Sequence, residues 1–232
     1  MDKRREILKR TVETTAEKYS EGAEFRAMIQ LIPYVGGAID TLFAGKGAKI
    51  QRQRFEMFLQ SLDSRLKKIE GCSDIAPDDD FYDFMVGVFE AVVRSKTQTK
   101  ISRFTALVTN QVLHAQPWDQ ADTATRILKE LEDIHIKILQ TVMHTPVCDT
   151  PFQGLKVSAL TKPLDKFVQP AATPLIKQFP EYPEALITLT CSELVSKGLL
   201  SDEGVGRYGT RVLQYFAATK SAEWLFNFIQ DH

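Results

Sequence analysis

The chain has 232 residues, 44% of them hydrophobic and 25% charged, and its formal net charge is -1. This composition is typical of a soluble globular protein, and it excludes a collagen-like chain, a disordered chain and a polytopic membrane protein. Cys72, Cys148 and Cys191 lie far apart, which argues against a disulfide framework and favours a reducing compartment. We therefore expect a cytoplasmic protein with a substantial buried core.

The first third of the chain is basic, with 14 basic and 10 acidic side chains over residues 1–70. Residues 2–20 have the apolar spacing of a helix, and residues 1–25 lack the apolar core of a signal peptide. A basic region suits an anionic surface, either phospholipid or an acidic partner. Interleaved glutamates leave a solvated helix face as the alternative.

An unusual stretch from residue 27 to 44 is almost entirely apolar, with Asp40 as its single charge. Pro33 and Gly36-Gly37 predict a break within it. Three alternatives follow: a buried core hairpin, a segment that enters a membrane after a conformational change, or a constitutive transmembrane helix. The candidate membrane or partner contacts are Ile32, Tyr34, Val35, Ile39, Leu42, Phe43, Lys46, Lys49, Arg52 and Arg54.

Amphipathic helices are predicted over the next hundred residues. The first runs from about Lys49 to Ile69, on a seam of Phe55, Leu59, Leu62, Leu66 and Ile69. Further helices are expected from about residue 81 to 93 and 101 to 113. A long helix over residues 122–143 follows, with two helices meeting near Asp133 as the alternative.

Residues 146–183 hold seven of the ten prolines, so no helix of ordinary length fits between most of them. Residues 155–160 and 164–168 could each supply one turn or a short strand. The apolar content of the segment favours an ordered, packed excursion over a mobile functional loop.

The C-terminal part predicts a helix from Tyr182 to Gly198, with Leu186, Leu189, Leu194 and Val195 facing inward. A glycine-rich turn over 204–209, a strand over 210–217 and a helix over 221–229 follow. Leu199 and Leu200 form a short apolar pair after the first of these helices. If the helix around Ile134 to Met143 is the first member, the order of helix, helix, two-strand wing and closing helix is winged-helix-like. We therefore predict a mainly all-α protein, with a multi-helix body at residues 1–117. A winged-helix-like module with a short β-hairpin follows at residues 118–232, and it carries residues 146–183 as an insertion.

Catalytic and metal-binding motifs are missing from the sequence. Gly45-Lys46 lacks the preceding glycine and the following Ser or Thr of a phosphate loop. His135 and His144 are not spaced to share a helix face, and no nucleophile elbow occurs. Cys191 lies in an apolar helical pattern that predicts core packing. We expect no enzymatic activity, cofactor, metal ion or small-molecule substrate.

DNA binding by the C-terminal module is an alternative, because a winged helix reads the major groove with one helix and contacts phosphates with its wing. The candidate nucleic-acid contacts are Lys197 on the helix and Arg207 and Arg211 in the wing. Neutralising several phosphates requires more basic groups than these. The sequence therefore favours a winged helix used for packing or partner contact.

Three features occur together in this chain: the segment Leu31 to Ala38 (LIPYVGGA), the basic amphipathic helix from Gln51 to Ile69, and residues 131–139 (LEDIHIKIL) ahead of the winged-helix-like tail. Together they resemble the abortive-infection alpha type of mostly helical proteins, found with bacterial anti-phage defence genes. The resemblance spans most of the chain, and the proline-rich insertion departs from it. It implies a defence role whose output is growth arrest or death of the host, and it brings no catalytic residues.

Taken together, the sequence predicts a non-enzymatic interaction or effector protein that acts through the apolar segment 27–44 and its basic flank. Its expected partners are another protein or further copies of the chain, with conditional contact to a membrane surface. A winged-helix transcriptional regulator and a structural scaffolding subunit are the alternatives.

Overall fold

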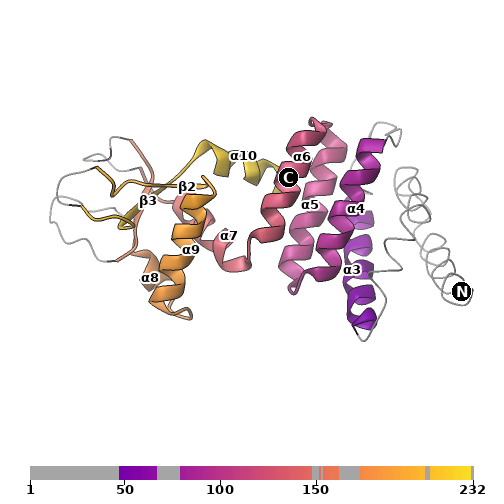
Figure 1. Cartoon of the computed structure of the whole chain (residues 1–232), viewed down its shortest axis with the longest axis horizontal. Helices are drawn as coiled ribbons and strands as arrows, with labels where there is room; N and C mark the ends of the chain where they lie inside the picture. The colour runs from indigo at the N-terminus through magenta and orange to yellow at the C-terminus, as the bar shows by residue number, and fades with distance from the viewer. Residues whose placement is uncertain are drawn as a thin grey trace, which may run out of the picture. The chain divides into compact units, whose positions relative to one another are not determined.

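The computed structural model describes residues 47–66, 79–147, 152, 154–161, 173–206 and 210–230. Within this part of the chain the protein is mainly helical, with 67% of the residues in eight helices and a small three-stranded antiparallel sheet (Figure 1). The predicted helix over 2–20 and the apolar segment 27–44 lie outside the described residues. No helix in the described ranges is both long and apolar enough to cross a bilayer.

The chain divides into two compact units, here called unit 1 and unit 2. Unit 1 comprises residues 1–130 together with 227–232, and unit 2 comprises residues 131–226. The division falls one helix later than the boundary expected after residue 117, because the helix that follows residue 117 packs within unit 1. The last residues of the chain also return to unit 1, which the sequence pattern does not indicate.

Among the described residues of unit 1, four helices pack on one another: α3 (Ala48–Leu66), α4 (Asp79–Arg94), α5 (Gln98–His114) and α6 (Trp118–Glu130). The predicted seam of α3 is buried as far as Leu66, and Ile69 lies outside the described residues. The predicted apolar face of α4 is buried throughout. The Phe89 ring packs edge-on against Phe55 and Phe58, with ring centroids 5.1 and 6.0 Å apart. Aromatic packing of this kind fixes α3 against α4.

Two side chains tie helix ends together in unit 1. Lys100 is buried on α5, and its ammonium donates a 2.9 Å hydrogen bond to the carbonyl of Lys129 in the last turn of α6. Asn110 is also buried on α5, and its amide nitrogen donates to the carbonyls of Asn227, Phe228 and Gln230 at the end of the chain. Helix C-termini leave carbonyls without intrahelical donors, and both side chains supply such donors.

Two helices cover the range of the long helix predicted over 122–143. The alternative, two helices meeting near Asp133, is therefore confirmed. α6 ends at Glu130 and α7 (Asp133–Met143) begins after Glu132, whose extended backbone serves as the N-cap. Leu131, which lies between the two helices in the sequence, is buried.

Unit 2 begins with α7 and continues with β1 (Val157–Ala159), α8 (Leu175–Gln178), α9 (Glu184–Ser196), β2 (Leu200–Asp202) and β3 (Tyr215–Ala218). α10 (Lys220–Ile229) follows, and its last residues belong to unit 1. The sheet has the order β1-β3-β2 with both pairs antiparallel. α7 packs on β3 and on α9.

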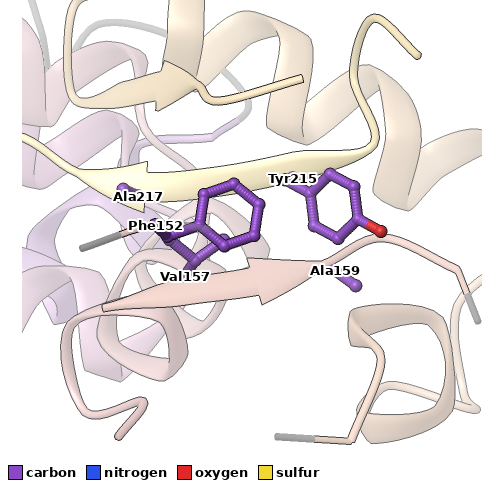
Figure 2. Packing of buried hydrophobic residues seen from close by; sticks show 5 residues of the cluster. All are labelled: Phe152, Val157, Ala159, Tyr215 and Ala217. Atoms are coloured by element: carbon purple, nitrogen blue, oxygen red, sulfur yellow. The ribbon is translucent and has the colours of Figure 1, made fainter. Parts of the chain in front are cut away.

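The buried side of the sheet is shown in Figure 2. Val157 and Ala159 of β1 lie beside Ala217 and Tyr215 of β3, in the register that pairs Val157 with Ala217. The Phe152 ring packs against Tyr215 with ring centroids 5.2 Å apart. The proline-rich segment therefore contributes a strand and an aromatic side chain to the core of unit 2, as its apolar content predicted.

The strand predicted over 210–217 is wrong in its first half. Leu213 has a φ of 59°, in the left-handed region, so the extended chain cannot begin before Gln214. β3 accordingly runs from Tyr215 to Ala218, and its partner β2 runs from Leu200 to Asp202 after α9. The predicted short hairpin is present as the antiparallel pair of β2 and β3, and β1 adds a third strand beside β3.

Candidate interaction surfaces

α9 presents an apolar face to solvent. Its buried face consists of Ile187, Thr190, Cys191 and Leu194. On the other side Leu186 is 39% exposed and Leu189 is 54% exposed, with the small Ala185 beside them. Leucines left in water forgo the stabilisation that burial provides, so two of them on one helix face mark a candidate surface for another molecule.

The prediction that Leu186 and Leu189 face inward was wrong. α9 is apolar around most of its circumference, so periodicity alone does not select which stripe meets the core. Packing against α7, α8 and β2 selects the stripe through Ile187 and Leu194. The sequence does contain a signal for an exposed apolar face, because α9 has more apolar residues than one helix face can bury.

A histidine–glutamate pair fixes α9 against α7. His135 is buried, and its Nδ1 accepts a 3.1 Å hydrogen bond from the backbone N–H of Glu132. Its Nε2 lies 2.6 Å from the Glu193 carboxylate. Because a backbone N–H can only donate, the proton of the neutral ring lies on Nε2 and is donated to Glu193. The pair thus caps α7 and positions a half-exposed carboxylate on α9.

A second acidic side chain lies near the start of α9. Lys137 of α7 lies 3.8 Å from the Glu181 carboxylate, and its ammonium lies over the Tyr182 ring at 5.6 Å from the centroid. Both partners of the ion pair are about half exposed, so the pair contributes little to stability. The positive charge of Lys137 therefore lies beside the Glu181 carboxylate and the Tyr182 ring.

The segment between β2 and β3, residues 203–214, is here called the β2–β3 loop, and its described residues include two further exposed apolar side chains. Val205 is 60% exposed and Val212 is 70% exposed. Arg211 between them in the sequence is exposed as well. Residues 207–209, including the candidate contact Arg207, lie outside the described part of the chain.

The basic candidates at the start of α3 differ in their surroundings. Lys49 is exposed and Arg52 is half-buried. Arg54 is half-buried too, and its guanidinium donates a 2.9 Å hydrogen bond to the Val93 carbonyl at the end of α4. Arg54 therefore ties α3 to α4. The other candidates of this group, from Ile32 to Lys46, lie outside the described residues.

Lys197 is half-buried at the C-terminal cap of α9, where its backbone N–H bonds to the Glu193 and Val195 carbonyls. It lies at the end of the helix, away from Leu186 and Leu189. The structure consequently does not bring Lys197 to the middle of the exposed face, where a base-reading side chain would be needed.

Cys191 is a core residue, as predicted. Its side chain is fully buried, and burial raises the pKa of its thiol to about 12. A thiol with such a pKa supplies almost no thiolate near neutral pH. Among the described residues, no group of three or more His, Cys, Asp or Glu side chains is placed to hold a metal ion.

Comparison with known proteins yields no match: no family model, curated protein or solved structure is similar to this chain.

Proposed function

We propose that this chain is a non-enzymatic interaction protein whose unit 2 is a winged-helix-like module that docks another protein on α9. The order of elements supports the first part. In the described residues unit 2 runs helix, strand, helix, helix, strand, strand, with β1 beside β3 on the side away from β2, and the start of α10 follows. A winged helix has this order, and its third helix, which corresponds to α9, is the one that reads its target.

The single observation that carries the docking role is the exposure of Leu186 and Leu189 on α9. A helix that reads DNA presents hydrogen-bonding or cationic side chains to base edges and phosphates. α9 instead presents two leucines with Ala185 and Ser196, and the ionised side chains on it are those of Glu184 and Glu193. Apolar side chains at the centre of a surface, with charges at its rim, are typical of protein interfaces.

The charge of unit 2 supports the same proposal. Residues 131–226 contain nine basic and ten acidic side chains, so the module has no excess of positive charge. Affinity for a DNA duplex depends on neutralising several phosphates. The transcriptional-regulator alternative therefore depends on a few exposed basic side chains such as Arg211.

In the cell we propose an effector or regulator role in anti-phage defence, as the resemblance to the abortive-infection alpha type implies. The apolar segment 27–44, with its basic flank, is the part proposed to meet a membrane or partner once a trigger loosens unit 1. Support comes from the sequence, since that segment carries one charge in eighteen residues.

Phage challenge of a bacterial host that expresses the full chain tests the proposal. We expect fewer plaques and slower host growth with the parent chain, and loss of both effects with Leu186→Ser/Leu189→Ser. Val147→Ser is the matched control, because Val147 is 53% exposed and lies outside α9, in a bridge to Lys156. Equal protection by the parent and the α9 variant would contradict docking through α9, and absence of any protection would contradict the defence role.

Two further measurements separate the alternatives. Fluorescence anisotropy of a labelled DNA duplex should show no binding at physiological salt. A salt-dependent shift that Lys197→Ala and Arg211→Ala weaken would favour the transcriptional regulator instead. Dye leakage from liposomes tests the membrane role of segment 27–44, which requires leakage by the full chain.

A further inference from the structure

A carboxylate lies on the same side of α9 as the exposed leucines. Leu186, Leu189 and Glu193 are spaced by three and four residues, and side chains at this spacing are neighbours on the surface of an α-helix. The Glu193 side chain is 45% exposed. These three side chains, here called the α9 face, therefore combine an apolar surface with an accessible carboxylate toward the C-terminal end of the helix.

The carboxylate of the α9 face is held in place by α7. Glu193 Oε2 lies 2.6 Å from Nε2 of the buried His135 ring, and the backbone N–H of Glu132 fixes that ring through its Nδ1 at 3.1 Å. A side chain that is ordered before binding loses little conformational entropy when it binds. An ionised carboxylate accepts several hydrogen bonds, so Glu193 can accept a further one from another molecule.

The neutral His135 ring donates a hydrogen bond to Glu193 but supplies no positive charge. The wider surface does not supply an excess of positive charge either. Residues 132–144 and 181–198 comprise α7 and α9 with their caps and the turn before α9. The carboxylates of these two ranges are those of Glu132, Asp133, Glu181, Glu184 and Glu193. Their ammonium groups are those of Lys137 and Lys197, and Lys137 already lies beside Glu181 at 3.8 Å.

We infer that the α9 face binds a basic amphipathic helix of another protein. Apolar side chains of that helix cover Leu186 and Leu189, and one of its Lys or Arg side chains pairs with Glu193. This inference rests on the proposed docking role of α9 and adds the chemistry of the partner. An amphipathic helix supplies both features from one side, because its apolar and charged side chains recur every three to four residues.

Other occupants fit the charges of this surface less well. The phosphates of a nucleic acid and the carboxylates of an acidic helix would both be repelled by Glu193 and its acidic surroundings. A second copy of the chain repeats the same excess of carboxylates, so it does not supply the positive charge. A basic helix is the partner that removes the two leucines from water and also neutralises the carboxylate.

Fluorescence anisotropy with the full chain and two labelled peptides tests the inference. The basic probe is a peptide of Leu, Ala and Lys with its leucines at helical spacing, and about 18 residues make it long enough to form a helix. The acidic probe has Glu in place of each Lys. We expect the basic probe to bind, with an affinity that added salt lowers. The acidic probe should bind about tenfold more weakly or less.

Matched variants separate the α9 face from the general charge of the protein. Glu193→Gln removes the charge but keeps an acceptor for His135, and it should lower the affinity for the basic probe about fivefold. Glu223→Gln makes the same change at an exposed position in the first turn of α10, and it should leave the affinity unchanged. Leu186→Ser/Leu189→Ser should lower the affinity about tenfold or more, because two leucines no longer leave water.

A charge reversal gives a result that misfolding cannot produce. Glu193→Lys should bind the acidic probe more tightly than the basic one, because the charge that selects the partner has changed sign. A parent-like preference of this variant for the basic probe would overturn the inference. So would equal effects of Glu193→Gln and Glu223→Gln, or no binding of the basic probe by the parent chain.

The same measurements distinguish this inference from the docking role of α9. Equal binding of the two probes, lost in Leu186→Ser/Leu189→Ser, would overturn the basic partner and leave docking through α9 intact. Tight binding of the basic probe that the leucine variant leaves unchanged would contradict both. Self-association of the parent chain that the leucine variant abolishes, without binding of the basic probe, would assign the α9 face to a second copy and overturn the inference.

Discussion

At the scale of single residues, burial decides what Cys191 can do. Burial raises the pKa of its thiol from 9.0 to about 12, so the folded chain holds the neutral form where the unfolded chain would ionise. The stabilisation that results is fully present below about pH 9 and is lost as the pH rises toward 12. Cys191 is therefore a packing residue with a measurable pH signature.

Urea unfolding at pH 8, 9, 10 and 11, in the presence of reductant, measures that signature. We expect the free energy of unfolding to fall on the order of 1.4 kcal/mol for each pH unit between the two pKa values. Cys191→Ala has lower stability at pH 8 because it leaves a cavity, and it lacks this part of the decline. Other titrating groups act in both proteins, so the difference between the two curves isolates Cys191. Parallel curves for the two proteins would contradict the prediction.

Asn110 provides a second prediction at this scale. Its amide nitrogen is the donor to three carbonyls at the end of the chain, at 3.0 to 3.2 Å. Asn110→Ala removes the donor and should cost about 1–3 kcal/mol. Asn110→Asp should cost more, because it places a carboxylate against carbonyl oxygens in a buried site. Urea unfolding of the two variants at pH 7 checks the order, and a more stable aspartate variant would show that Asn110 does not act as the donor.

At the scale of elements, the conformation of the β2–β3 loop requires a residue without a Cβ at position 204. A Cβ on Gly204 would lie 2.0 Å from the Arg211 carbonyl oxygen, a backbone atom that cannot rotate away. Gly204→Ala should therefore destabilise unit 2 by about 2 kcal/mol or more. Gly206→Ala is the control: its φ of 75° is unfavourable for alanine but its surroundings are open, so about 1 kcal/mol is expected. Thermal unfolding of the two variants should give the lower midpoint for Gly204→Ala.

The same scale shows which elements the sequence predicts and which it does not. The seam of α3 and the buried face of α4 follow from helical spacing, because each has one clear apolar stripe. α9 has no such stripe, so its orientation depends on the tertiary contacts of Ile187 and Leu194. β3 begins late because the φ of Leu213 is a tertiary outcome that no propensity for leucine indicates. The interaction surfaces were missed for the same reason: their residues look like core residues in the sequence.

At the scale of the whole molecule, the chain does not divide in simple sequence order. Unit 1 takes its first residues from the N-terminal part and its last from residues 227–232. A composition shift cannot reveal such an arrangement, because the returning segment belongs to a helix whose earlier turns are in unit 2. Asn110, whose amide nitrogen donates hydrogen bonds to this segment, is a polar residue at a buried position of α5.

Truncation after Phe226 tests the importance of the returning segment to unit 1. It removes the buried Phe228 and Ile229 as well as the three carbonyls that Asn110 contacts. Burying one such side chain stabilises a protein by about 1.5–3 kcal/mol, so the truncation should cost more than Asn110→Ala. Hydrogen exchange by mass spectrometry should show faster exchange of the α5 amides, while removal of residues 231–232 alone should leave the α5 amides protected. Unchanged protection of α5 after truncation at Phe226 would mean that unit 1 is stable without the end of the chain.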